Sequence, residues 1–247
     1  MDTVERSTPA TGVGTDARDR LAVALDVPDS RSALELVDRL DGSCRWLKVG
    51  MELYYSAGNV LVEALRGRGF SIFLDLKLHD IPNTVAGAVR SVTSIGAELL
   101  TIHASGGPAM LRAAAEAAQA PGAPRLLAVT VLTSMDSDEL NAAGVPGLPA
   151  DQVLRLAKLA KSSGIDGMVC SPEEVAAVRA VTGPESILVI PGIRPAGSAA
   201  DDQKRMATPG EAIARGASML VVGRPITRAV DPAAAARAIL DEISTAR

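Results

Sequence analysis

Residues 71–76 read Ser-Ile-Phe-Leu-Asp-Leu, a short and mostly apolar run that is typical of a buried strand. After a short connection, residues 84–96 carry apolar side chains at helical spacing, so the two segments predict one strand followed by one helix. The same alternation recurs along the chain. The other predicted strands span residues 21–25, 46–50, 98–103, 125–132, 167–170, 187–190 and 218–223. The other predicted helices include residues 32–40, 108–119, 151–163 and 172–181.

Strand and helix alternate about eight times over roughly 225 residues, which is the pattern of a (β/α)8 TIM barrel of typical length. An open, doubly wound parallel sheet is the alternative, because the same alternation is compatible with it. Helix start signals support the predicted helices: Ser171-Pro172-Glu173-Glu174 and Asp231-Pro232 each place a capping side chain before a proline. No linker divides the body of the chain, so we expect one barrel domain over residues 21–247. We expect residues 1–20, which are mostly polar, to form a disordered extension.

The composition excludes several classes of protein. The 247 residues carry 25 Lys and Arg against 29 Asp and Glu, a net charge of −4, and only 2% of the residues are aromatic. No nucleic-acid partner is expected, because surfaces that bind nucleic acid are basic and stack bases on aromatic rings. Apolar runs such as residues 187–190 are far shorter than the ~18 residues of a membrane span. We therefore expect a cytoplasmic protein with no membrane association.

Charged side chains lie where the predicted strands end. Side chains of a barrel strand alternate between the interior and the helix layer, and active sites lie at the carboxyl ends of the strands. Asp26 follows the first strand, and Lys48 lies on the second. Asp75 and Lys77 share the face of the third strand that is opposite its leucines. Because a lone buried charge costs several kcal/mol, we expect these charges to be paired, either in an active site or in an ion-pair network that closes the barrel.

A second group of polar residues follows the seventh and eighth predicted strands. Arg194 comes after the seventh strand, and Gly223 and Arg224 come after the eighth. Barrels commonly bind phosphate at this place with backbone N–H groups, and arginine forks match phosphate oxygens. The sequence therefore predicts a phosphorylated ligand, unless the two arginines are surface charges. The loop at residues 195–210, which carries Gln203, is long enough to form a lid over such a ligand.

Residues 73–84 read Phe-Leu-Asp-Leu-Lys-Leu-His-Asp-Ile-Pro-Asn-Thr, which closely resembles the D-x-K-x-x-D signature of the orotidine 5′-phosphate decarboxylase family in its bacterial form. The resemblance covers nearly the whole chain after residue 20. It includes residues 25–26, 47–52, 130–134, 191–194 and 222–224. It implies a TIM-barrel homodimer that needs no cofactor or metal and converts orotidine 5′-monophosphate to uridine 5′-monophosphate and carbon dioxide, the last step of de novo pyrimidine synthesis.

The resemblance also implies roles for individual residues. Lys77 matches the proton donor, and Lys48, Asp75 and Asp80 complete the charged array around it. Asp80 and Thr84 match positions that reach the active site of the neighbouring subunit, so the sites would be shared. The substrate-binding positions implied are Asp26 and Lys48 at the ribose, Thr133 and Ser134 at the pyrimidine, Arg194, Gln203, Gly223 and Arg224 at the phosphate, and also Asp75, Lys77, Asp80, Ile81 and Thr84.

Two other functions stay open. A sugar-phosphate decarboxylase or aldolase of the same superfamily is similar at D-x-K-x-x-D but uses a magnesium ion, and a phosphate-binding barrel without activity is the second alternative. His79 and His103 belong to no metal-binding spacing. We expect His79 to be structural and His103 to support the site by hydrogen bonding. Cys44 and Cys170 are far apart in the sequence, and we expect inert thiols.

Overall fold

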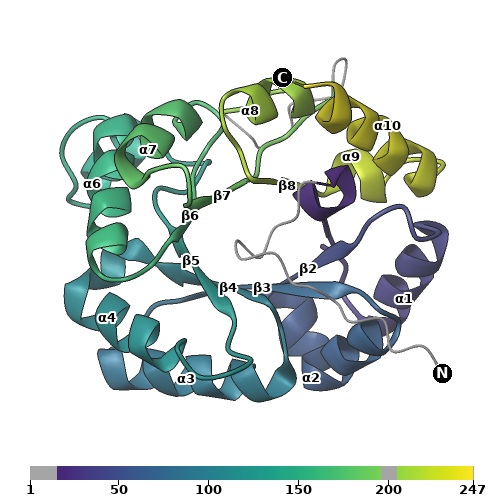
Figure 1. The fold of residues 1–247 in the computed structure, drawn as a ribbon, viewed down its shortest axis with the longest axis horizontal. Helices are drawn as coiled ribbons and strands as arrows, with labels where there is room; N and C mark the ends of the chain where they lie inside the picture. Colours follow the sequence, from purple (N-terminus) through teal and green to yellow (C-terminus); the bar gives the residue numbers. More distant parts are fainter. Residues whose placement is uncertain (1–15, 196–204, 247) are drawn as a thin grey trace.

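The computed structural model describes residues 16–195 and 205–246, which form a closed parallel barrel surrounded by helices (Figure 1). The strands of this part of the chain follow one another round the barrel in sequence order, and β8 pairs with β1 to close it. They are β1 (Leu21–Ala24), β2 (Trp46–Gly50), β3 (Ser71–Leu78), β4 (Leu99–His103), β5 (Arg125–Val129), β6 (Gly167–Val169), β7 (Ile187–Ile190) and β8 (Met219–Val222). The predicted (β/α)8 TIM barrel is confirmed, and the doubly wound sheet is excluded.

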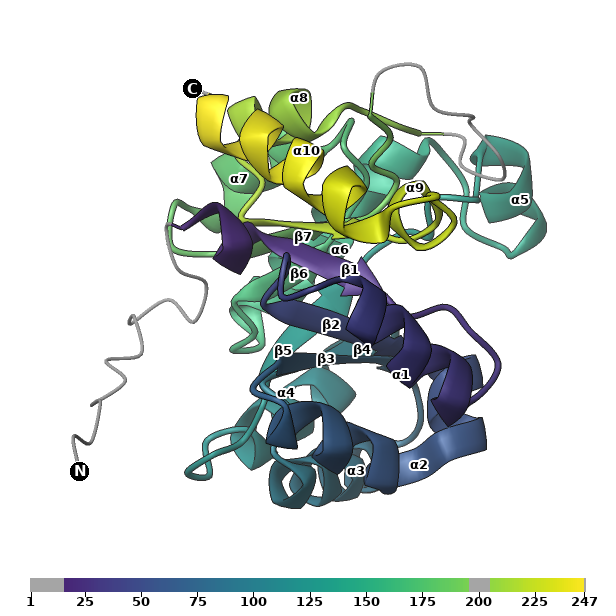
Figure 2. The same ribbon diagram turned by 90° about the vertical axis from the view of Figure 1, so that its right-hand side faces the viewer.

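The helices form the outer layer of the barrel (Figure 1). Two short helices, α5 and α9, are additional to the alternating pattern and lie toward the same end of the barrel (Figure 2). The helices are α1 (Ser30–Arg39), α2 (Met51–Gly67), α3 (Pro82–Ile95), α4 (Gly107–Ala117), α5 (Ser137–Ala142), α6 (Pro149–Ser162), α7 (Val175–Thr182), α8 (Pro209–Ala214), α9 (Arg224–Thr227) and α10 (Pro232–Thr245), with 3-10 turns η1 (Ala17–Arg20) and η2 (Ala104–Gly106). Over the described ranges, none of the helices has the length and apolar composition needed to cross a membrane.

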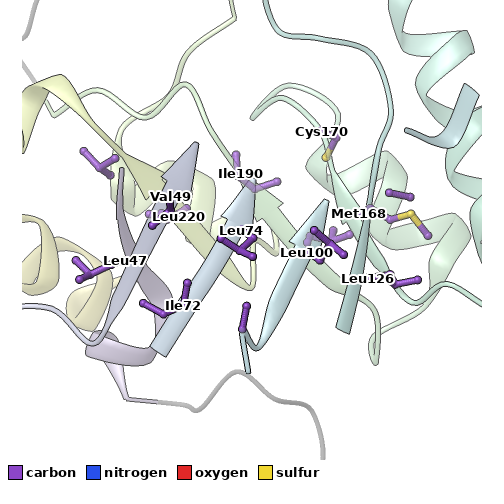
Figure 3. Close-up of a cluster of buried hydrophobic side chains, with 14 of the residues drawn as sticks. Leu47, Val49, Ile72, Leu74, Leu100, Leu126, Met168, Cys170, Ile190 and Leu220 are labelled. Carbon is purple, nitrogen blue, oxygen red and sulfur yellow. The ribbon is translucent and has the colours of Figure 1, made fainter. Parts of the chain in front are cut away.

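The alternation of side chains along each strand produces two apolar layers. One cluster fills the barrel interior and consists of Ala22, Trp46, Phe73, Leu99, Leu127, Ile187, Val189 and Met219. The other lies between the strands and the helices, and it unites residues from distant parts of the chain, such as Leu47 and Leu220 (Figure 3). Ile72 and Leu74 belong to this outer layer, as their spacing predicts. Each buried leucine contributes about 1.5–3 kcal/mol to stability, so this layer holds the strand ends in place.

The amino-terminal boundary differs from the prediction. Ala17–Arg20 form the 3-10 turn η1, whereas the sequence predicts that they belong to a disordered extension. The Arg20 guanidinium donates hydrogen bonds to the carbonyl oxygens of Ala217 (2.6 Å) and Ser218 (3.3 Å). This turn is ordered because it bonds to the segment before β8, a contact that the local sequence does not reveal. The rest of the expected extension, residues 1–15, lies outside the described residues.

Several element ends also differ from the prediction. β3 continues to Leu78, β5 ends earlier at Val129, and α7 begins at Val175 rather than at Pro172. The start of α7 is displaced because the Glu174 carboxylate accepts hydrogen bonds from the Ser171 N–H and hydroxyl, and so closes a turn before the helix. The start of α10 is confirmed, because the Asp231 carboxylate accepts a hydrogen bond from the Ala234 N–H at 2.9 Å.

Gly167 at the start of β6 provides a test of the barrel packing. A Cβ atom at this position would collide with the backbone carbonyl oxygen of Leu126 on β5. We expect Gly167→Ala to lower the free energy of unfolding by about 1–3 kcal/mol. The measurement is urea unfolding followed by circular dichroism.

Gly67 in α2 is the matched control, because a Cβ there meets nothing within 4 Å. Gly67→Ala should leave the free energy of unfolding unchanged or raise it by up to about 1 kcal/mol, since alanine favours the helix. Equal stability of the two variants would contradict this account of the β5–β6 contact.

Candidate active site

A cavity of about 240 Å³ opens among the residues at the carboxyl ends of the barrel strands. This is the end of the barrel at which the charges of the sequence are predicted to meet. Most of the predicted site residues line it. They are Asp26, Lys48, Asp75, Lys77, Thr133, Arg194, Gly223 and Arg224.

The floor of the cavity is apolar. Five inward-facing residues of the strands contribute to the lining, and they are Phe73, Val129, Val169, Val189 and Val221. Phe73 and Val189 belong to the cluster that fills the barrel interior, and Val169 and Val221 pack against it. The polar groups above this floor are therefore shielded on one side from water, which strengthens the interactions among their charges.

Four charges of alternating sign run across one wall of the cavity. The Lys48 Nζ lies 3.2 Å from Asp26 Oδ1 and 3.3 Å from Asp75 Oδ2. The Lys77 Nζ lies 2.8 Å from Asp75 Oδ1. The side chain of Lys48 is 9% exposed and that of Asp75 is 14% exposed, so each needs its partners. The predicted pairing of the four charges is confirmed, and they form one continuous array.

The array holds its buried members in their charged forms. Burial by itself would lower the pKa of Lys48, but the carboxylates of Asp75 and Asp26 outweigh burial and raise this pKa above its ordinary value. Burial would likewise raise the pKa of Asp75, but Lys48 and Lys77 lower it below its ordinary value, with help from hydrogen bonds. The cavity wall therefore presents fixed ammonium and carboxylate groups at neutral pH.

Thr101 on β4 contacts this array and is missed by the sequence reasoning. It is 1% exposed, and its hydroxyl bonds both to the Lys77 N–H and to Asp75. Lys77 itself has a positive φ of +50°. The regular pairing of β3 with β4 ends at Leu74, so Lys77 lies in an irregular stretch of the strand. A buried threonine opposite two charged residues is the one sequence signal that could have pointed to this contact.

Arg194, Gly223 and Arg224 lie at the ends of β7 and β8 and line the same cavity. The Arg194 N–H donates to the Ala207 carbonyl oxygen at 3.0 Å, which fixes the backbone after β7. Gly223 precedes α9, and a Cβ there would lie 3.4 Å from Asp26 Oδ2. Guanidinium groups on one side and the charged array on the other match a ligand that carries a phosphate at one end.

The structure does not bring the remaining predicted residues into this cavity. Asp80 and Ile81 line a separate open hollow, and Ile81 is 67% exposed. Thr84 and Ser134 are exposed and line neither space. Gln203 lies outside the described residues, as does most of the loop expected to act as a lid. In a single copy of the chain the charged array therefore lacks Asp80.

Comparison with known proteins identifies the family. Residues 19–239 match the model of the family described as "Orotidine 5'-phosphate decarboxylase / HUMPS family". The chain belongs to this family. The resemblance seen in the D-x-K-x-x-D segment is thus confirmed over nearly the whole barrel.

Close relatives and a solved structure agree with the family assignment. The chain is 49% identical over 234 residues to the orotidine 5′-phosphate decarboxylase of Moorella thermoacetica, covering 92% of this chain and 93% of that protein. It is 55% identical over 228 residues to the orotidine 5′-phosphate decarboxylase of Halorhodospira halophila, covering 92% of this chain and 97% of that protein. The crystal structure of orotidine 5′-phosphate decarboxylase from Lactobacillus acidophilus matches with a TM-score of 0.82 and 42% identity, covering 92% of this chain and 99% of that one.

A buried ion pair ties together the loops beside the cavity. The Arg205 guanidinium bonds through Nη1 to Glu174 Oε1 and donates through Nη2 to the Leu132 carbonyl oxygen at 3.0 Å. Glu174 and Arg205 are 5% and 8% exposed. Leu132 and Thr133 line the cavity, so the pair connects the loops after β5 and β6 with the segment before α8. This pair could not be predicted from the sequence, because its members lie 31 residues apart.

The two histidines lie outside the lining of the cavity, whereas Cys170, one of the two cysteines, belongs to it. The rings of His79 and His103 lie 5.3 Å apart between centroids, and neither lines the cavity. Burial, with His79 and Lys77, lowers the pKa of His103. Cys44 and Cys170 are buried free thiols, and burial raises the pKa of both, as expected for inert thiols. Residues 16–195 and 205–246 contain no cluster of three or more metal-ligating side chains.

The Glu174–Arg205 pair is the basis of a stability prediction. Glu174→Gln leaves the buried guanidinium of Arg205 without a counter-charge, so we expect the free energy of unfolding to fall by about 3 kcal/mol. Urea unfolding of the purified variant measures the change.

The matched control is the exposed pair formed by Arg31 and Glu35, whose side chains are 88% and 63% exposed. Glu35→Gln should change the free energy of unfolding by less than about 0.5 kcal/mol. If Glu174→Gln cost no more than this control, the buried pair would not hold the loops together.

Proposed function

We propose that this protein decarboxylates orotidine 5′-monophosphate to uridine 5′-monophosphate and carbon dioxide, the last step of de novo pyrimidine synthesis, in the cytoplasm. The observation that carries the proposal is the Lys77 ammonium held 2.8 Å from Asp75 in a cavity that Arg194 and Arg224 also line. Membership of the family and the names of its relatives supply the substrate.

The reaction needs a fixed cation beside one carbon atom. Cleavage of the bond between C6 of the pyrimidine and its carboxylate leaves the electron pair on C6, while carbon dioxide departs. That lone pair lies in the plane of the ring and cannot be delocalised as an enolate is, so an adjacent ammonium group is its stabiliser. The fixed position of the Lys77 ammonium means that little reorganisation is needed as the negative charge develops.

Lys77 then donates a proton from Nζ to C6 and regains one from water. Asp75 accepts a hydrogen bond from Lys77 Nζ and keeps the ammonium in position. Lys48 anchors Asp75 from the opposite side, at 3.3 Å. No electron leaves the substrate in this sequence, so the chemistry requires no redox cofactor.

The remaining residues bind the parts of the substrate that do not react. We assign Asp26 and Lys48 to the ribose and Thr133 and Ser134 to the pyrimidine. The phosphate is assigned to Arg194, Gln203, Gly223 and Arg224. Binding energy from the phosphate, remote from C6, can thereby contribute to the rate as well as to affinity.

The active form is proposed to be a homodimer with shared sites. Asp80 and Ile81 line a hollow next to Pro82 and Ser105 rather than the cavity that contains Lys77. Asp80, Ile81 and Thr84 are all exposed in a single chain. We propose that they complete the site of a second copy, where Asp80 would lie beside that copy's Lys77.

A direct assay tests the proposed function. Purified protein should convert orotidylate to uridylate in the presence of a metal chelator. The conversion is followed by the ultraviolet absorbance, which differs between the two nucleotides. Loss of activity with the chelator, restored by magnesium, would favour the sugar-phosphate type of enzyme. No turnover at saturating orotidylate would refute the function.

Lys77→Ala is the matched variant for the assay. It removes the cation and the proton donor but none of the groups assigned to the phosphate, so it should bind uridylate and lose turnover. Calorimetric titration with uridylate measures the binding. Near-normal turnover would remove Lys77 from its role as proton donor.

Mixing two inactive variants tests the shared sites. Hybrid dimers of Lys77→Ala and Asp80→Ala contain one site with both defects and one site with neither. Mixing should therefore restore up to about a quarter of the wild-type activity if subunits exchange freely, since half of the dimers are hybrids. No recovery, with subunit exchange confirmed by differently tagged chains, would show that each site belongs to one chain.

A further inference from the structure

The Thr101 hydroxyl joins the backbone of Lys77 to the carboxylate of Asp75. Thr101 Oγ1 accepts a hydrogen bond from the Lys77 N–H at 2.9 Å and donates one to Asp75 Oδ1 at 3.0 Å. Asp75 Oδ1 also accepts a hydrogen bond from Lys77 Nζ at 2.8 Å. These bonds close a ring in which the two ends of Lys77, its amide and its ammonium, are connected through Thr101 and Asp75.

The Lys77 amide depends on this hydroxyl because the strand pairing fails at Lys77. β3 and β4 pair at Leu74 with Leu100 and next at Leu78 with Ile102, so β3 advances four residues while β4 advances two. Lys77 occupies the left-handed region in this irregular stretch, with φ of +50°, which is uncommon for a residue other than glycine. Such a conformation persists only where its surroundings hold it. The hydrogen bond to Thr101 replaces a strand partner for this N–H.

The direction of the hydroxyl proton is determined by these partners. A hydroxyl can donate one hydrogen bond, and that of Thr101 donates it to the Asp75 carboxylate. The hydroxyl oxygen in turn accepts a hydrogen bond from the Lys77 amide. Threonine is branched at Cβ and has few rotamers, so a buried threonine holds its hydroxyl in a narrow range of positions. At 1% exposure no bulk water competes for either bond.

We propose that Thr101 is a positioning residue that sets the Lys77 ammonium against Asp75 in the geometry needed for protonation of C6. The inference rests on the proposed decarboxylase function and deepens it. Thr101 does not line the cavity and touches no part of the substrate that the cavity could hold. Thr101 acts through Asp75 and Lys77, which line the cavity.

The variants Thr101→Val and Thr101→Ser test the proposal. Valine keeps the shape and removes both hydrogen bonds, whereas serine keeps the hydroxyl. We expect Thr101→Val to lower kcat about 10- to 100-fold, with uridylate affinity changed less than about 3-fold, because hydrogen bonds to charged groups carry effects of this size. Thr101→Ser should recover most of the lost kcat. Thr101→Ala serves in place of valine if the latter fails to fold.

The pH profile separates positioning from a general loss of packing. The groups that face Asp75 are Lys48 on β2, Lys77 on β3, and Thr101 and His103 on β4. Thr101 donates to the charged form of Asp75, so its loss raises the pKa of Asp75. The acid limb of kcat/KM should therefore move to higher pH in Thr101→Val and stay in place in Thr101→Ser.

Thr182→Val is the matched control, because Thr182 is also buried and donates its hydroxyl to the Val178 carbonyl oxygen in α7. It should lose stability without a change in kcat or in the pH profile. A folded Thr101→Val or Thr101→Ala protein that binds uridylate and turns over at the wild-type rate would overturn the proposal. An inactive wild-type protein, assayed in parallel, would instead refute the decarboxylase function.

Discussion

Lys48 is a buried residue, 7% exposed, and its ammonium group lies between the carboxylates of Asp26 and Asp75 at hydrogen-bond distance. A buried cation on its own would cost several kcal/mol, so its position depends on both carboxylates. Asp26 follows β1 and Asp75 lies on β3, and these strands flank β2, which carries Lys48. The register of β1, β2 and β3 is therefore tied to the charge pairing in the cavity, and Lys77 extends the same array to the place where the chemistry is proposed to occur.

β3, which carries Asp75 and Lys77, departs from regular strand geometry within the candidate site. β3 is regular as far as Leu74, and Ile72 and Leu74 pack against the helices as in any barrel strand. Beyond this point the pairing with β4 is irregular, and Lys77 takes a left-handed conformation. In a regular strand the Lys77 N–H would donate its hydrogen bond to a backbone carbonyl oxygen of the neighbouring strand. Here a buried threonine hydroxyl accepts that bond instead, and the same hydroxyl orients Asp75.

A buried ion pair, separate from the charged array, holds the loops beside the cavity. Glu174 and Arg205 form a buried pair that reaches the Leu132 carbonyl oxygen and the Ser171 backbone. Replacement of such a pair by apolar residues is often neutral for stability, but removal of one partner is costly. The pair fixes the backbone next to Thr133, whose side of the cavity is assigned to the pyrimidine.

The barrel and most of the charged array could be predicted from the sequence, because both follow from short-range periodicity. Alternation along residues 71–78 predicts which side chains face the interior, and the active sites of barrels lie at the carboxyl ends of the strands, where these charges pair with one another. The bonds of Thr101, the Glu174–Arg205 pair and the order of Ala17–Arg20 could not be predicted in this way. Each joins residues that are 24 or more positions apart, as in Lys77 and Thr101 or Arg20 and Ala217. Local sequence determined what each strand presents, and tertiary structure decided which groups meet, because hydrogen-bond partners depend on distances that only the closed barrel sets.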